Sequence, residues 1–186
     1  MTSISTVPLS SDAQNLLNRL IPRIHARLGE VERVPVSILL WGPGIDSTNP
    51  LWNTRTDLRD ILRSKGHAAV FREELCDPSS PYSIRLQQLA QAQEFDLVVS
   101  IPCTPGSIGE IHDFAADRRV NGKVLVFLNN EYMSGYSAQS LTAISTILSC
   151  QIEYYPNDRE TDLIRTATLS EVQRIREVRY LLSGRF

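Results

Sequence analysis

The sequence predicts an α/β protein: a flavodoxin-like or Rossmann-like three-layer sandwich with a five-stranded, mostly parallel sheet and an extra N-terminal helix. Short apolar runs and helix-length segments alternate five times along the 186 residues. The longer runs are nearly continuously apolar, which is typical of strands buried on both faces of a parallel sheet. Parallel neighbours need a crossover connection, and the alternation supplies a helix for each one.

Five apolar runs are expected to form the strands. The last of them, Gln151-Ile-Glu-Tyr-Tyr155, alternates between apolar and polar residues and is therefore expected at an edge of the sheet. In chain order the strands are expected over residues 36–41, 68–71, 95–101, 123–128 and 151–155.

Five segments that follow these runs are expected to form helices. In the first segment Leu51, Leu58 and Leu62 lie near one face, and Gly66 follows as a plausible C-terminal cap. The helices are expected over residues 51–65, 83–93, 107–119, 137–148 and 169–182.

An additional amphipathic helix is expected over Ser11–Leu28, ahead of the first strand. One stripe of this helix is apolar, so it either covers the edge of the sheet or docks a partner. We therefore divide the chain into an N-terminal helical extension, residues 1–34, and a single α/β domain, residues 35–186. The stripe consists of Leu16, Leu17, Leu20, Ile24 and Leu28.

Composition restricts the function and the location. The formal net charge of −2 argues against a general nucleic-acid binder, because it implies no strongly basic surface. Three widely spaced cysteines form no CxxC pair and indicate reduced thiols. The N-terminus lacks the pattern of a signal peptide, and no run of 18 apolar residues occurs. We expect a soluble cytoplasmic protein that binds neither membrane nor nucleic acid directly.

Ligands of open parallel sheets bind beyond the carboxyl ends of the strands, where the strand order reverses. This rule selects the loops at residues 42–48, 72–82 and 102–109. The first loop holds Gly42 and Gly44 but no GK[ST] and no third glycine, so it is neither a P-loop nor a dinucleotide-binding turn. Its glycines indicate either a tight turn or a close approach of the backbone to a ligand, and the sequence leaves both open.

The loop after the third strand carries the most chemistry. A helix is expected to open at about Ser107, with Glu110 three residues on, which is the spacing of a capping box. In that interpretation Glu110 caps its own helix. In the other, Pro105 and Gly106 leave backbone N–H groups open to an anion, and Glu110 points into the same cleft. A carboxylate placed there can attack an anomeric carbon or stabilise an oxocarbenium-like centre.

Other chemistries are less well supported. A response regulator needs an aspartate at the end of the third strand, whereas Asp96 stands at its start. Cys103 near a helix N-terminus is a candidate nucleophile, but no histidine is clearly placed as its base. His25, His67 and His112 show no metal-ligand spacing, so no metal and no other cofactor is expected.

The stretch from Asp96 to Ala115, followed by Gly122-Lys123-Val124 and an apolar strand, resembles the nucleoside 2-deoxyribosyltransferase-like superfamily. That superfamily includes nucleotide N-glycosidases and is structurally related to Toll/interleukin-1 receptor (TIR)-like NAD-cleaving domains. The resemblance covers roughly residues 36–128. It implies that Glu110, one turn after the Gly106-Ser107 turn, is the catalytic residue.

The resemblance implies an N-glycosidase that cleaves NAD, a nucleotide or a nucleoside without a cofactor. Ser107 and the amides near Pro105 and Gly106 would hold a phosphate. Gly42, Pro43 and Gly44 would border the base, together with Trp41 or Trp52. The family's acidic residue before the turn is missing here, which favours hydrolysis over deoxyribosyl transfer and leaves Asp46 or Asp57 as substitutes.

Bacterial relatives in this superfamily often act as toxic effectors in defence systems. A homo-oligomer or a complex with a regulating protein is therefore expected. Two alternatives from other classes stay open: a catalytically silent TIR-like module that binds a nucleotide signal or a partner, and a structural subunit that docks through its N-terminal helix.

Overall fold

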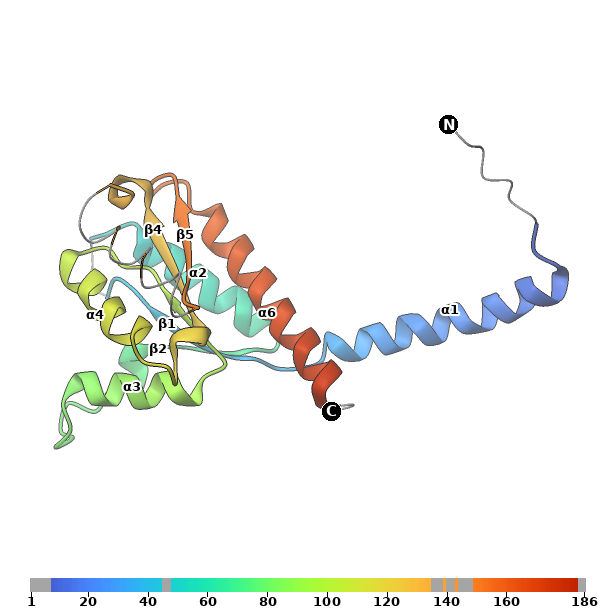
Figure 1. The fold of residues 1–186 in the computed structure, drawn as a ribbon, viewed down its shortest axis with the longest axis horizontal. Helices are drawn as coiled ribbons and strands as arrows, with labels where there is room; N and C mark the ends of the chain where they lie inside the picture. Colours follow the sequence, from blue (N-terminus) through green and yellow to red (C-terminus); the bar gives the residue numbers. More distant parts are fainter. Residues whose placement is uncertain (1–7, 45–47, 135–138, 140–142, 144–148, 184–186) are drawn as a thin grey trace. The chain divides into compact units, whose positions relative to one another are not determined.

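The computed structural model describes the chain except for residues 1–7, 45–47, 135–138, 140–142, 144–148 and 184–186. Its contacts divide the chain into two compact units. One unit is Pro35–Ile175, and the other combines Met1–Val34 with Arg176–Phe186. Helices and strands carry the labels of Figure 1.

The larger unit is built on one five-stranded sheet in which every neighbouring pair is parallel. The strand order is β2-β1-β3-β4-β5, which is the flavodoxin-like order, so the predicted fold class is confirmed. β2 and β5 are the edge strands, as the alternation in β5 predicts. The strands are β1 (Ser37–Trp41), β2 (Ala68–Phe71), β3 (Leu97–Ser100), β4 (Val124–Asn129) and β5 (Gln151–Tyr155).

The helices lie where the apolar periodicity places them, with shifted ends. The helix expected at residues 137–148 lies almost wholly outside the described residues. The helices are α1 (Ser11–Val31), α2 (Leu51–Ser64), α3 (Ile84–Glu94), α4 (Pro105–Ala115) and α6 (Asp162–Ser183), with 3₁₀ turns η1 (Arg72–Glu74), η2 (Asn121–Lys123) and η3 (Asn130–Tyr132).

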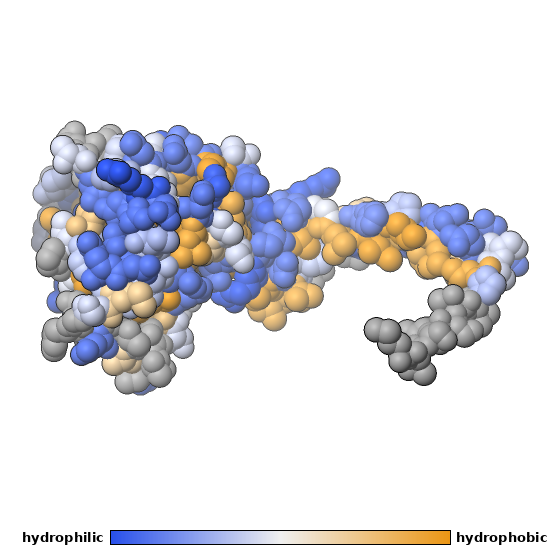
Figure 2. Space-filling view, turned by 90° about the horizontal axis from the view of Figure 1, so that it is seen from above, coloured by the Kyte–Doolittle hydropathy of each residue, from blue (hydrophilic) through white to orange (hydrophobic). Residues whose placement is uncertain are grey.

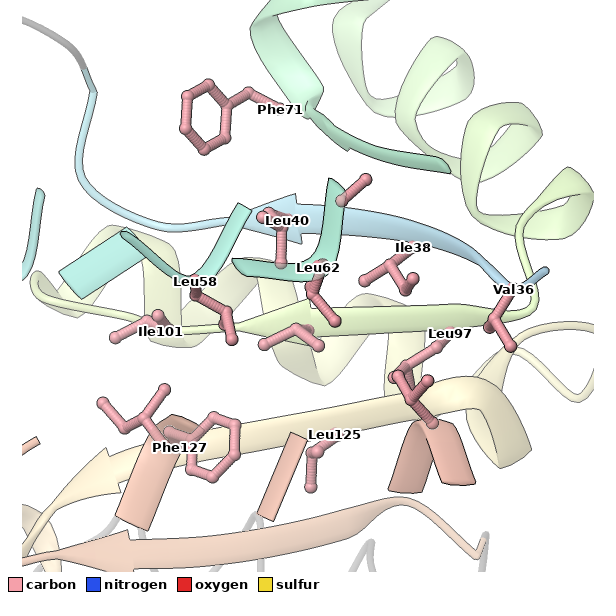
Figure 3. Close-up of a cluster of buried hydrophobic side chains, with 14 of the residues drawn as sticks. Val36, Ile38, Leu40, Leu58, Leu62, Phe71, Leu97, Ile101, Leu125 and Phe127 are labelled. Carbon is pink, nitrogen blue, oxygen red and sulfur yellow. The ribbon is translucent and has the colours of Figure 1, made fainter. Parts of the chain in front are cut away.

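One face of the sheet is covered by α2 and by the first part of α6. Leu58 and Leu62 of α2 meet Ile38 and Leu40 of β1 in one buried cluster, which also includes Phe127 of β4 (Figure 3). Alternate residues of a strand point to opposite faces, so Leu39 belongs to the other cluster. This second cluster fills the space between the sheet and α3 and α4, and completes the three layers.

The smaller unit joins α1 to the end of α6 through polar contacts. The guanidinium of Arg176 donates to the backbone oxygen of Val34 at 3.0 Å and to the Glu32 carboxylate at 2.8 Å. The Tyr180 hydroxyl donates to Glu30 at 3.0 Å. Within α1, Val31 is the buried residue. Of the predicted apolar stripe, Leu16, Leu17, Ile24 and Leu28 are exposed, and Leu20 is half-buried.

Candidate functional site

A pocket of about 410 Å³ opens at the carboxyl ends of β1 and β3. These two strands are the neighbours at which the chain turns to opposite edges of the sheet, the usual ligand position in an open α/β fold. The size suits a small-molecule ligand. The pocket is lined by Trp41, Gly42, Pro43, Gly44, Arg72, Ser100, Pro102, Cys103, Thr104, Gly106, Ser107 and Glu110.

The pocket brings together most of the residues predicted from the sequence. Pro105 is the first residue of α4, and Asp46 lies outside the described residues. Sequence reasoning does not point to Arg72, although its loop after β2 is one of the three selected as ligand-binding positions. The predicted residues on the pocket wall are Gly42, Pro43, Gly44, Gly106, Ser107 and Glu110.

The predicted capping box of Ser107 and Glu110 is wrong. The helix begins two residues earlier, because Pro105 suits the first turn and Thr104 caps it. The Thr104 hydroxyl accepts from the Ser107 N–H at 3.2 Å, and the Ser107 hydroxyl accepts from the Thr104 N–H at 3.0 Å. Ser107 is therefore the partner in the cap. The Gly106 N–H is left as a first-turn donor without an acceptor among the described residues.

This shift frees Glu110 from the role of a cap. Its side chain is half-exposed on the pocket wall, and one carboxylate oxygen lies 3.3 Å from the guanidinium of Arg72. Arg72 comes from η1, directly after β2, whereas Glu110 comes from α4. The pocket thus holds a carboxylate beside a guanidinium and a free backbone N–H, a combination suited to an anionic substrate with an electrophilic carbon.

A fully buried arginine holds two walls of the pocket. Arg55 of α2 donates to the backbone oxygens of Leu40 at 2.6 Å and Pro43 at 2.8 Å. The same guanidinium makes a bidentate pair with Glu73 at 2.6 and 2.7 Å. Since Glu73 is the residue after Arg72, Arg55 fixes both the turn at Pro43 and the segment that carries Arg72.

The Arg55 pair affects the pKa of Glu73. Burial would raise this pKa, but the hydrogen bond and charge of Arg55, together with a backbone hydrogen bond, outweigh it and leave the pKa below 4.5. A carboxylate with a depressed folded-state pKa stabilises the fold above the unfolded-state pKa, and this contribution disappears as the pH falls through the folded-state value.

The variant Glu73→Gln is expected to be less stable than the wild type at pH 7, by about 1 kcal/mol for a half-exposed partner. The difference in the free energy of unfolding should shrink as the pH falls below about 4.5, where protonation removes the charge in the wild type as well. Urea unfolding of both proteins between pH 3 and pH 7 measures the difference, and a pH-independent difference would contradict this role of Glu73.

Gly42 is the point at which the first loop leaves no room for a side chain. A Cβ there would lie 3.2 Å from the Ile101 backbone oxygen and 3.2 Å from Cδ of Arg55. The variant Gly42→Ala is expected to lose about 1–2 kcal/mol of stability through this overpacking. The matched control is Gly44→Ala, whose Cβ would meet nothing within 4 Å and should change stability by less than about 0.5 kcal/mol. Equal thermal unfolding of the two variants would count against a tight turn.

The two tryptophans have different positions. Trp41 ends β1, lines the pocket and packs on Phe114 with ring centroids 4.3 Å apart. Its indole N–H is buried without a hydrogen-bond partner among the described residues. Trp52 packs instead on Phe71, at 5.2 Å, beside the α2 core. Of the two predicted neighbours of a base, Trp41 is therefore the one at the pocket.

Asp57 does not supply the acid that the loop lacks. It lines a separate hollow of about 430 Å³ on α2, together with Asp60 and Asp162. That hollow lies away from the carboxyl ends of β1 and β3 and contains neither Glu110 nor Arg72. We therefore assign the function to the pocket at the strand ends.

A carboxylate that sequence reasoning missed lies near the end of β5. Asp158 accepts from the Asn129 amide at 2.9 Å and from the Tyr155 hydroxyl at 3.1 Å. Burial raises the pKa of the Cys103 thiol, and the charge of Asp158 adds to this effect. The carboxylate is thus within electrostatic reach of the pocket wall. A raised thiol pKa also argues against Cys103 as a thiolate nucleophile.

Asp96 has a structural role at the amino ends of β1 and β3, on the side of the sheet opposite the pocket, where its carboxylate accepts from the N–H of Ser37 at 2.8 Å. No cluster of three or more His, Cys, Asp or Glu residues suited to a metal occurs in the described part of the chain. Within the same residues, no helix has the length and apolar character needed to cross a bilayer. Comparison with protein-family models and with curated proteins finds no match to this chain.

Proposed function

We propose that the pocket is the active site of an N-glycosidase that cleaves the bond between a base and a ribosyl carbon in NAD, a nucleotide or a nucleoside. The observation that carries the proposal is the Glu110 carboxylate, which lies on the pocket wall without a part in the helix cap. Glu110 attacks or stabilises the anomeric carbon as the base departs. Water then supplies the hydroxyl group of the sugar product. Its proton goes to the departing base of a nucleotide or nucleoside, whereas nicotinamide leaves cationic NAD as a neutral base and the proton is released to solvent.

The neighbours of Glu110 favour a phosphorylated substrate. Arg72 can donate several hydrogen bonds in a planar fork, of which one side meets Glu110. The free N–H of Gly106 stands at the positive end of α4. Together they give a phosphate two kinds of donor on the wall that carries the carboxylate.

Hydrolysis is favoured over transfer, because the residues just before the α4 cap, Pro102 and Cys103, include no second carboxylate. As part of this proposal, the protein acts as a cytoplasmic effector of a bacterial defence system, and self-association or a regulating protein controls its activity. The competing proposal is a silent module that binds a nucleotide signal in the same pocket.

The test is to incubate the purified protein with NAD, nucleoside monophosphates and nucleosides, and to measure free base by chromatography. Release of base from at least one of them supports the proposal. Thermal stabilisation by a nucleotide without any base release would identify the silent module instead. If no compound of the panel is cleaved and none stabilises the protein, both the N-glycosidase and the silent nucleotide-binding module are overturned.

Exchange of Arg72 for glutamine is expected to raise KM for phosphorylated substrates about tenfold, because a charge-assisted hydrogen bond to phosphate is worth about 1.5 kcal/mol or more. Cleavage of unphosphorylated nucleosides should change little. The control is Arg85→Gln, which removes a 70% exposed arginine that pairs with Asp113. A uniform loss across all substrates would argue against phosphate recognition by Arg72.

A further inference from the structure

The apolar stripe of α1 is exposed along the helix. Figure 2 shows it as a band of apolar side chains between polar ones. Apolar patches of several hundred Å² are typical of interaction sites in folded proteins. Four stripe residues have exposed fractions of 52% (Leu16), 37% (Leu17), 54% (Ile24) and 61% (Leu28), and the neighbouring Ile21 is 44% exposed.

Two residues of this helix lower its intrinsic helical stability. Pro22 lies inside it and Gly29 near its end, at a cost of about 3 and 1 kcal/mol relative to alanine. The hydrogen bonds from Arg176 and Tyr180 of α6 reach Glu30 at the C-terminal end of this helix and the segment just after Val31. Most helical stability in proteins comes from packing of the apolar face, and the side chains of this face are exposed.

The spacing of one row of apolar residues on α1 favours a helix as the cover, and this row is called the seam. Leu17, Ile21, Ile24, Leu28 and Val31 follow one another at intervals of four, three, four and three residues. These are the intervals of the seam of a two-stranded coiled coil, in which each apolar side chain inserts between side chains of a facing helix. In this heptad the helix-disfavouring Pro22 and Gly29 both fall on the outer surface, away from the seam.

The order of the four exposed seam residues, without the buried Val31, favours one partner. Leu17-x₃-Ile21-x₂-Ile24-x₃-Leu28 reads the same in both directions. An antiparallel pair of identical helices therefore places Leu17 against the partner's Leu28, and Ile21 against the partner's Ile24. Such reciprocal contacts are the property of a two-fold symmetric interface.

Charge is compatible with this pairing. Beside the seam stand Asn18, Leu20, His25 and Arg27, and the antiparallel pair brings Arg27 beside the partner's Leu20. No like charges face one another, so the pairing carries no electrostatic penalty.

A lipid surface fits the helix less well, because a membrane-surface helix carries a strongly basic polar face. Three arginines (19, 23 and 27) against Asp12 and Glu30 leave α1 with a net charge of +1.

The exposed apolar surface of α1 is large enough for a dimer interface. Doubled over two copies, the exposed stripe would bury on the order of 1,000 Å², the lower bound for a specific interface. The end of α6 belongs to the same unit and adds exposed apolar side chains that can extend the contact. These are Val178, Leu181 and Leu182, with exposed fractions of 40%, 78% and 83%.

We propose that α1 docks a second copy of this chain, helix against helix and antiparallel. The dimer stands independently of the chemistry at Glu110. Sedimentation or light scattering should give twice the 20.9 kDa chain mass at micromolar concentration. The seam variant Ile24→Glu should raise the dimer dissociation constant on the order of 100-fold or more, because each copy buries a charge. Ala26→Glu, on the outer surface, is the matched control and should remain dimeric.

Circular dichroism and thermal unfolding of the Ile24→Glu variant show whether its sheet domain is still folded, and so distinguish loss of dimerisation from unfolding. A mixture of the Leu17→Cys variant and the Leu28→Cys variant should form a disulfide between position 17 of one copy and position 28 of the other. Disulfides that join only position 17 to position 17, or position 28 to position 28, would overturn the antiparallel geometry. A monomeric wild type at tens of micromolar would overturn the proposal. So would a monomer that binds phosphatidylserine vesicles, which would assign the stripe to lipid.

Discussion

Replacing Glu110 by glutamine is expected to lower base release by about 10³-fold or more, the scale on which a catalytic carboxylate contributes. Glutamine keeps the size and one hydrogen-bond acceptor, but it can neither act as the nucleophile nor offset positive charge at the anomeric carbon. The fold should be unaffected, because the Arg72 pair is partly exposed and worth less than about 1 kcal/mol. Base release and thermal unfolding of the same preparation measure both effects.

Asp113→Asn is the matched control for this experiment. Asp113 lies on the same helix, α4, and pairs with Arg85 at 2.9 Å, but it does not line the pocket. Its exchange should leave turnover within about twofold, since nothing in the proposed chemistry depends on it. If the two variants were equally active, Glu110 would not be the catalytic residue. If the two were equally impaired, the loss would belong to the helix and not to the carboxylate.

The sheet could be predicted because its signal is local in the sequence. A run such as Leu97–Ser100 is buried at every position, and its apolar character shows this without knowledge of its neighbours. Helix ends were less predictable. α4 ends at Ala115, not at residue 119, because Asp117 accepts from the Arg119 N–H in a local turn. α6 begins at Asp162, where packing of Ile164 outweighs the low helix propensity of the threonines that follow.

Sequence reasoning could predict those parts of the candidate site whose residues come directly after a strand. The pocket segments at Gly42 and Gly106 come directly after β1 and β3, and parallel strands bring their carboxyl ends to one edge. Arg72, Arg55 and Asp158 could not be placed in this way. Their roles depend on side-chain contacts between elements far apart in sequence, and a lone arginine or aspartate on a helix or loop is usually solvated.

Truncation of Arg55 to alanine is expected to cost about 3 kcal/mol or more of folding stability. Its side chain is fully buried, and its removal leaves the backbone oxygens of Leu40 and Pro43 without their donor. Each buried acceptor without a partner costs about 1–3 kcal/mol, and the space left by the side chain adds to the loss. The guanidinium also lies 4.3 Å from the ring centroid of Phe71, a contact that alanine cannot make.

Arg165→Ala is the control for this truncation, because Arg165 is 52% exposed and pairs with an exposed Asp162. It should cost less than about 1 kcal/mol, and urea unfolding of both variants compares them directly. Arg55→Lys tests the geometry, since lysine keeps the charge but cannot reach two carbonyls and a carboxylate in one plane. If Arg55 holds the turn at Pro43 and the segment with Arg72 in place, Arg55→Lys should lose turnover more steeply than stability. A lysine variant that matches the wild type in both would mean that charge alone, and not the fork, supports the pocket.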